Sequence, residues 1–277
     1  MTSAQAAVGR LVVCPTPIGN LEDVTLRVLE VLAAADVVAC EDTRHTKVLL
    51  DRHGLSAPLL SLHEHNERAR AMKLVARVRD GDLVALVSDA GTPLISDPGF
   101  VLVGACLAAG LEVEVLPGPS AVVTALVCSG LPAERWRFVG FLPRGRAQLE
   151  DLLAHSPETL VAFESPRRLA ATLRLIAAHD ELRAAVVCRE LTKLHEEVRR
   201  GSAGELAEHY GTHPAKGEIV LVLGACAADG ARREEALGAL RELLSAGARL
   251  RPAAAAVAKL TGMRANELYR ELMSDGQ

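Results

Sequence analysis

Apolar and polar positions follow two different patterns along this chain. Short, continuous apolar runs alternate with longer stretches in which apolar residues recur every three or four positions. The short runs predict strands buried on both faces of a sheet, and the longer stretches predict helices packed against it. In the first half, strands are expected at 11–14, 36–39, 59–61, 83–87 and 112–116. The expected helices lie at 24–34, 46–53, 67–80 and 99–109, and another begins at Ser120.

The pattern breaks at residues 129–134, SGLPAE, and a second unit follows. It begins with FVGFLPR, and its expected elements are strands at 158–164, 184–191 and 218–224 and a helix at 166–178. Beyond a linker-like segment at 225–230, short helices are expected at 231–245, 252–260 and 264–273. We therefore predict an α/β protein with an N-terminal domain at 10–130, a second domain at 131–226 and a small C-terminal helical module at 227–277.

Loops rich in glycine and proline follow the apolar runs, at 14–20, 88–99, 117–120 and 164–168. Loops at the carboxyl ends of parallel strands surround a common cleft, so these loops predict a binding site. Gly91 leaves room for a ligand to approach the backbone, while Pro93 and Pro98 restrict the loop. For any single loop, an ordinary turn between strand and helix is the alternative. Neither GxGxxG after the first strand nor GxxxxGK[ST] occurs, so a dinucleotide or triphosphate site has little support.

Composition narrows the class of protein further. The 277 residues carry a net charge of -4, which argues against a basic protein that binds nucleic acid over its whole surface. Only 3% of the residues are aromatic, which argues against a surface on which bases stack. From residue 231 onward, the chain has eight basic and six acidic side chains, so the tail is slightly basic. The six cysteines show no metal-ligand spacing, and neither a signal peptide nor a membrane span is evident. These features predict a soluble, cytoplasmic protein with reduced thiols and no membrane association.

Polar residues cluster where strands end. Glu41, Asp42 and Arg44 follow one expected strand, and 63–67 and 189–196 follow others. Glu41 and Asp42 have two interpretations, as catalytic carboxylates or as acidic residues that favour a helix start. His63 and His65 lack a third ligand at fixed spacing, so no metal site is predicted.

Several segments resemble the ribosomal RNA small-subunit methyltransferase I family, within the tetrapyrrole methylase superfamily. The matching segments are LVVCPTPIGNLEDVTLRVLEVL, ACEDTRHTKVLL, LVSDAGTPLISDPG, VLPGPSA, GFLPR, FESPRRL and GEIVLV, in the order seen in that family. The resemblance covers roughly residues 10 to 275. The loop after FLPR departs from it, since GRAQ is less basic than the family's lysine-rich version.

The resemblance implies a two-domain tetrapyrrole-methylase-like fold that binds S-adenosylmethionine between its domains and works as a homodimer. It implies methyl transfer to the ribose 2′-oxygen of a cytidine in the decoding region of 16S ribosomal RNA, within the small ribosomal subunit. The helical tail corresponds to the family's RNA-binding appendage. The cofactor residues that it implies are Ile18, Thr92, Ile95, Ser120, Ala121, Phe163, Leu191 and Glu218.

A ribose hydroxyl is a poor nucleophile, so we expect a base, or a cation that stabilises the alkoxide. The catalytic candidates are Glu41, Asp42 and Arg44, with Lys193 and Glu64 as second choices. The expected phosphate contacts are made by the tail and by Arg144, Arg146, Arg167 and Arg168.

Two other functions remain open from sequence alone. The chain could methylate a tetrapyrrole carbon, as relatives in the superfamily do, although its PTPIGN loop and its extra tail argue against this. It could also be a cofactor-binding or ribosome-assembly protein without catalytic activity. The sequence does not locate the modified nucleotide, identify the base or define the dimer interface.

Overall fold

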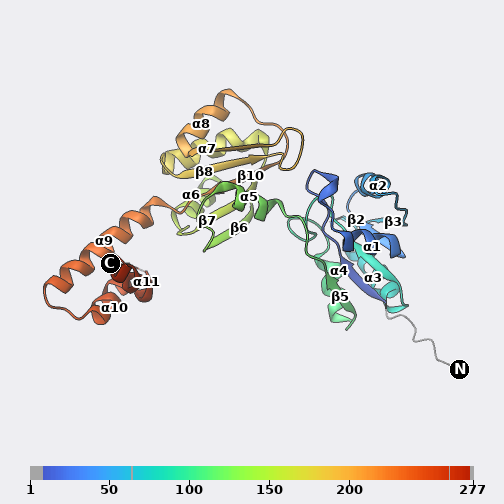
Figure 1. Cartoon of the computed structure of the whole chain (residues 1–277), viewed down its shortest axis with the longest axis horizontal. Coiled ribbons are helices and arrows are strands. Elements are labelled where there is room, and N and C mark those ends of the chain that lie inside the picture. The colour runs from blue at the N-terminus through green and yellow to red at the C-terminus, as the bar shows by residue number, and fades with distance from the viewer. Residues whose placement is uncertain (1–8, 64, 262, 275–277) are drawn as a thin grey trace.

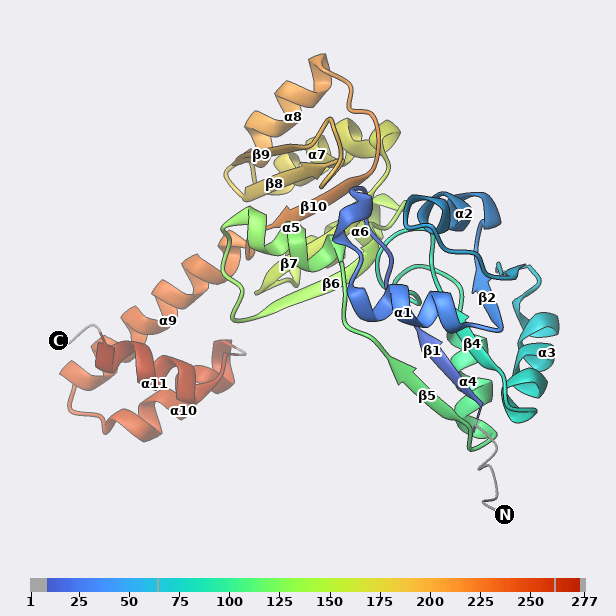
Figure 2. The same cartoon turned by 45° about the vertical axis from the view of Figure 1, so that its right-hand side comes forward.

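The computed structural model describes residues 9–63, 65–261 and 263–274, with the backbone alone for 227–235 and 274. Its strands form two sheets, each covered by helices, and three further helices gather near the C-terminus (Figure 1). The turned view in Figure 2 shows the same order, with the second sheet between the first sheet and the C-terminal helices. Within the described residues, no helix combines the length and apolar content needed to cross a bilayer.

The first sheet is entirely parallel, with the order β3-β2-β4-β1-β5. Its strands are β1 (Arg10–Val13), β2 (Val37–Cys40), β3 (Leu59–Ser61), β4 (Leu83–Leu86) and β5 (Glu112–Val115). All five were expected, and their ends differ from the predicted ends by at most one residue. The continuous apolar runs of β1, β2 and β4 occupy the centre, where both faces of the sheet are covered.

Helices cover both faces of this sheet. They are α1 (Leu26–Ala34), α2 (Thr43–Arg52), α3 (Glu67–Arg79) and α4 (Phe100–Ala108), with a short 3-10 turn, η1 (Leu21–Asp23), before α1. Helices α1 and α2 pack on one face, and α3 and α4 pack on the other. The neighbouring strands β1 and β4 therefore lead into helices on opposite faces. In a parallel sheet, this reversal opens a crevice beyond the carboxyl ends of the two strands.

The second sheet is mixed, with the order β6-β7-β10-β8-β9. Its strands are β6 (Trp136–Phe141), β7 (Thr159–Glu164), β8 (Ala184–Arg189), β9 (Glu197–Ser202) and β10 (Ile219–Leu223). Only β6 and β7 run parallel; the other three pairings are antiparallel. Its helices are α6 (Arg146–Ala154), α7 (Pro166–His179) and α8 (Ala203–Thr212) on one face and α5 (Ala121–Ser129) on the other.

Helix α5 packs in a different unit from the one expected. The proposed N-terminal domain at 10–130 includes this helix, but Val122, Ala125 and Leu126 pack against strands of the second sheet. The apolar sequence AVVTALVCS has no polar face to indicate which sheet it covers. Ser120 caps the helix as expected, since its hydroxyl accepts a hydrogen bond from the Val123 N–H.

Four elements of the second unit were not predicted as a strand or helix: β6, in the segment where the unit was expected to begin, and β9, α6 and α8. Strand β9 lies at the sheet edge and carries Arg199 and Arg200, so no continuous apolar run marks it. Helix α8 has a readable signal in its capping box, in which Ser202 and Glu205 each bond the other's backbone N–H.

The C-terminal helices are α9 (Ala227–Ser245), α10 (Leu250–Thr261) and α11 (Ala265–Ser274). All three were expected, although α9 begins inside the segment predicted as a linker. Their common core includes Leu240, Val257 and Leu268. An ion pair of 2.8 Å between Arg135 and Glu267 connects α11 to the chain just before β6.

A buried carboxylate fixes the start of α4. The Oε1 atom of Glu67, on α3, accepts hydrogen bonds from the N–H groups of Gly99 and Val101, both at 2.9 Å, and Glu67 is only 8% exposed. A carboxylate at this position also favours the positive end of the helix dipole. Glu67 thereby fixes the end of the loop 88–99 against the neighbouring helix.

We expect Glu67→Ala to destabilise the protein by about 1–3 kcal/mol, because it leaves two N–H groups without their charged acceptor. The measurement is the urea midpoint, compared with that of Glu112→Ala, which removes an exposed glutamate from β5. Equal midpoints for the two variants would show that Glu67 does not stabilise the loop.

Candidate functional site

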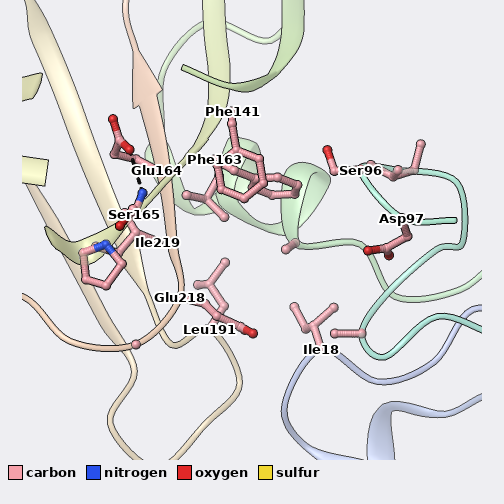
Figure 3. Close-up of a pocket in the computed structure, with 16 residues that line it drawn as sticks. Ile18, Ser96, Asp97, Phe141, Phe163, Glu164, Ser165, Leu191, Glu218 and Ile219 are labelled. Atoms are coloured by element: carbon pink, nitrogen blue, oxygen red, sulfur yellow. Dashed lines mark hydrogen bonds between the residues drawn. The ribbon is translucent and has the colours of Figure 1, made fainter. Parts of the chain in front are cut away.

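A cavity of about 480 Å³ lies where the carboxyl edge of the first sheet meets the second sheet (Figure 3). Ile18 and residues 95–97 line it from the first unit. Phe163, Leu191 and residues 217–220 line it from the second unit. This volume is typical of small-molecule sites, and most of the lining is apolar.

The loops after β1 and β4 are joined directly at the edge of the first sheet. The Thr16 N–H donates to the Gly91 carbonyl at 2.8 Å, and the Gly91 N–H donates to the Thr16 carbonyl at 3.0 Å. Ser88 adds a hydroxyl bond to the Gly91 carbonyl at 3.0 Å. The PTPIGN and GTPLI segments therefore lie side by side, as the predicted common cleft requires.

Gly91 has a different role from the one expected. Its φ of +81° lies in the left-handed region, and an added Cβ would approach the Cγ2 atom of Ile18 to 3.3 Å. The missing side chain thus makes room for Ile18, which itself lines the cavity.

The first loop also contacts the second unit closely. The Asn20 N–H donates to the Thr192 hydroxyl at 2.9 Å. A Cβ on Gly19 would lie 2.5 Å from Cγ of Lys193 and 2.9 Å from the Leu191 carbonyl oxygen, so only glycine fits there. Glu190 and Thr192 both have positive φ, which is strained for residues with a side chain.

The structure brings together most of the expected cofactor residues. Six of the expected cofactor residues line the cavity: Ile18, Ile95, Ala121, Phe163, Leu191 and Glu218. Thr92 and Ser120 are not among the lining residues. The Thr92 hydroxyl donates to the Pro119 carbonyl at 3.1 Å, and Ser120 caps α5, so both hold loops in place.

One wall of the cavity is aromatic. Phe163 packs edge to face against Phe138 and Phe141, with ring centroids 5.0 and 5.5 Å apart. Phe141 and Phe163 both line the cavity, and Leu191 and Ile18 lie nearby (Figure 3). These side chains suit a flat, weakly polar ring such as a nucleobase.

The carboxylate of Asp97 lines the cavity on the side of the first sheet, and the sequence interpretation did not include it. Burial, followed by the nearby charges of Glu41 and Asp89, raises the pKa of Asp97 to about 6. Leu94 and Ser96, close to it in the loop, both have positive φ. The repeated Ser-Asp pair at 88–89 and 96–97, in a loop already identified as a binding loop, is the signal that could have revealed it.

None of the expected catalytic residues lines the cavity among the residues described. Glu41 and Asp42 follow β2, and Asp42 caps α2 by accepting the Arg44 N–H at 2.8 Å. Asp42 also pairs with the Arg44 guanidinium, which holds the pKa of that carboxyl below its usual range. Burial raises the pKa of Glu41. The helix-start interpretation of Asp42 is thus supported by its capping bond.

Lys193, the next catalytic candidate, forms ion pairs beside the cavity. The Lys193 ammonium lies 3.0 Å from Glu190 and 2.7 Å from Glu218, so it joins two loops beside the cavity. Glu64 lies outside the described residues. The rings of His63 and His65 are 6.0 Å apart, and in the described part of the chain no three His, Cys, Asp or Glu side chains are arranged to hold a metal ion.

Comparison with known proteins gives consistent matches. The sequence profile of the Tetrapyrrole (Corrin/Porphyrin) Methylases matches residues 10–207. A "Ribosomal RNA small subunit methyltransferase I" of Mesorhizobium japonicum is 48% identical over 93% of this chain and 89% of its own length. The protein of that name from Escherichia coli O157:H7 is 44% identical over 97% of this chain and 96% of its own length.

Solved structures share the fold. A uroporphyrin-III C-methyltransferase from Thermus thermophilus, solved in complex with S-adenosylhomocysteine, aligns with a TM-score of 0.56 at 21% identity. The alignment covers 78% of this chain and 97% of that one. At this identity the comparison supports the fold alone.

We expect Gly19→Ala to destabilise the contact between the two units by about 1–3 kcal/mol, because the new methyl group has no space beside Lys193 and Leu191. The measurement is the midpoint of thermal unfolding. Gly104→Ala on α4, where an added Cβ meets nothing within 4 Å, is the matched control and should not lower the midpoint. A Gly19→Ala midpoint equal to that of the control would contradict the close approach.

The raised pKa of Asp97 predicts a pH-dependent cost in stability. Because its pKa rises from 3.8 to about 6 on folding, protonated Asp97 favours the folded state below pH 3.8, and this contribution is lost as the pH rises through 6. We expect Asp97→Asn to unfold at a higher urea concentration than the unsubstituted chain above pH 6, with the difference vanishing near pH 4.

The matched control is Asp80→Asn, which changes an exposed aspartate at the far end of α3. An Asp97→Asn difference that stayed constant between pH 4 and pH 8 would show that the carboxyl does not titrate in this way.

Proposed function

This chain belongs to the tetrapyrrole (corrin/porphyrin) methylase family, and we propose that it methylates small-subunit ribosomal RNA, using S-adenosylmethionine. The proposed acceptor is the ribose 2′-oxygen of a cytidine in the decoding region of 16S ribosomal RNA. The observation that carries the proposal is the 44% identity over 97% of the chain. This likeness extends past residue 207, where the general family match ends, into the C-terminal helices.

The residues of the cavity fit the cofactor. S-adenosylmethionine supplies a methyl group carried on a positively charged sulfur. Phe163, Leu191 and Ile18 form apolar walls for the nucleoside, and the Glu218 carboxylate can attract the positive charge of the cofactor. Lys193 holds Glu218 in place through their 2.7 Å ion pair.

The chain's own contribution to the reaction is first of all positional. Holding the hydroxyl at near-attack distance can contribute about 7–11 kcal/mol to lowering the barrier. We propose that Glu41, Asp42 and Arg44 act at the acceptor side, where Arg44 is 89% exposed and oriented by Asp42. An exposed guanidinium there suits a phosphate or a developing alkoxide.

The proposed RNA contacts are made by arginines next in sequence to cavity-lining segments and by the tail. Arg144 and Arg167 are exposed, close in sequence to the cavity-lining residues Phe141 and Pro166. Arg168, in contrast, donates to the carbonyls of Leu142 and Pro143 and so supports the loop. Arg146 pairs with Glu150 at 2.7 Å. The proposed assembly is a homodimer that acts on the small ribosomal subunit, with α9 to α11 contacting RNA.

We expect a strain without this chain to lack one ribose methyl on a single cytidine of 16S ribosomal RNA. Mass mapping of nuclease fragments measures it. Supplying the chain should restore the methyl. Ala121→Trp should not, because the bulky ring fills the cavity. Ala33→Trp, on the exposed surface of α1, is the matched control and should restore it.

Unchanged ribose methylation in the deletion strain would contradict the proposal. Methylation of a tetrapyrrole carbon by the purified chain would then favour the alternative activity. Binding of S-adenosylmethionine without transfer to either acceptor would instead indicate a protein that binds the cofactor but does not catalyse.

A further inference from the structure

We propose that Asp97 is the catalytic base, which accepts the proton of the ribose hydroxyl as the methyl group is transferred. This inference rests on the proposed function of the same cavity. It assigns the proton transfer to a residue of the loop 88–99 rather than to the polar cluster that follows β2.

Among the described residues, three carboxylates line the cavity, and two of them are already engaged. Glu164 is 2% exposed, accepts the Ser165 N–H and the Thr172 hydroxyl, both at 2.6 Å, and points away from the cavity in Figure 3. Glu218 pairs with Lys193 at 2.7 Å. Asp97 faces the cavity, and within the described part of the chain the charged groups that raise its pKa are the carboxylates of Glu41, Asp89 and Glu218. Asp97 is therefore the lining carboxylate best able to accept a proton.

The backbone holds Asp97 in a defined position. The loop is fixed at one end by the pairing of Gly91 with Thr16, and at the other by the bonds from Glu67 to Gly99 and Val101. Between these points Leu94 and Ser96 adopt positive φ, a strained conformation of the kind that concentrates at functional sites. A loop held at both ends keeps its carboxylate in position without the ordering cost of a mobile side chain.

The surroundings also give Asp97 suitable basicity. The charged groups that act on its pKa are Glu41 just after β2, Asp89 in the loop after β4 and Glu218 just before β10, while the Ser88 hydroxyl donates to the Gly91 carbonyl. Burial and these like charges raise the pKa of Asp97 to about 6, while Ser88 lowers it. The group is therefore ionised at pH 7 and more basic than an ordinary aspartate, which suits a general base.

The step balances in atoms and charge. The hydroxyl O–H bond breaks and its proton passes to an Asp97 carboxylate oxygen. The hydroxyl oxygen forms a bond to the methyl carbon as the carbon–sulfur bond breaks and its electron pair returns to sulfur. One negative and one positive charge disappear together, leaving a neutral carboxylic acid, a methyl ether and a neutral thioether.

The test compares Asp97→Asn, Asp97→Glu and the control Asp80→Asn. Single-turnover methylation is measured from pH 5 to pH 9, with saturating S-adenosylmethionine and small subunits from a strain that lacks this chain. For the unsubstituted chain we expect the rate to rise through about pH 6 to a plateau. Asp97→Asn should be about 100-fold slower or more and lose this rise, since general-base catalysis contributes about 10² to 10⁴. Asp97→Glu should recover part of the rate, and the control all of it.

Two further readouts do not depend on turnover. Calorimetry with S-adenosylhomocysteine should give affinities within about twofold for all the variants, because the proton acceptor is not needed to hold the product. A carboxyl carbon NMR titration of the cofactor-free protein, assigned with Asp97→Asn, should place the pKa of Asp97 near 6.

Several results would overturn the inference. One is a full rate and an unchanged pH profile for Asp97→Asn. Another is a large loss of S-adenosylhomocysteine affinity with normal turnover at saturation, which would make Asp97 a binding residue. A titration near pH 4 would also contradict it. Failure of the unsubstituted chain to methylate the small subunits would contradict the proposed function instead, so the two failures are distinguishable.

Discussion

The structure depends on the backbone pairing between Thr16 and Gly91. This pairing joins the loops of two neighbouring strands, β1 and β4, whose following helices cover opposite faces of the first sheet. Without it, the crevice at the carboxyl edge would be bounded by two independent loops. With it, Ile18 is seated over Gly91, and Ser96 and Asp97 lie on the side of the cavity opposite Phe163 and Glu164. The same constraint thus shapes both the apolar and the acidic parts of the cavity.

Polar groups near the cavity divide into those that hold loops and those left available for chemistry. Four of these side chains form hydrogen bonds with neighbouring backbone groups: Glu67, Thr92, Ser120 and Glu164. Asp97 faces the cavity among other carboxylates, in an arrangement that is costly for folding. A carboxylate kept where its charge is unfavourable is typical of a group retained for reactivity rather than for stability.

Much of the fold could be predicted because the buried strands are strongly patterned. β1, β2 and β4 are continuous apolar runs, and Ser120 marks the start of α5. The edge strand β9 could not be found in this way, since its exposed Arg199 and Arg200 interrupt any apolar run. The sheet on which α5 packs was equally hidden, because that helix is apolar on every side. In the site, motif resemblance located six lining residues. The repeated Ser-Asp pair could have drawn attention to Asp97, but only the fold of the loop shows that Asp97 rather than Asp89 lines the cavity.

The two walls of the cavity come from different units, and this has an energetic consequence. The first unit supplies Asp97 and Ile18, and the second supplies the aromatic wall and Glu218. A ligand that contacts both walls gains its full binding free energy only when the units are in the arrangement described here. By mass action, such a ligand stabilises that arrangement over any in which the units separate. The close contact of Gly19 with Leu191 and Lys193 predisposes the chain to the same arrangement before a ligand arrives, which lowers the cost of binding.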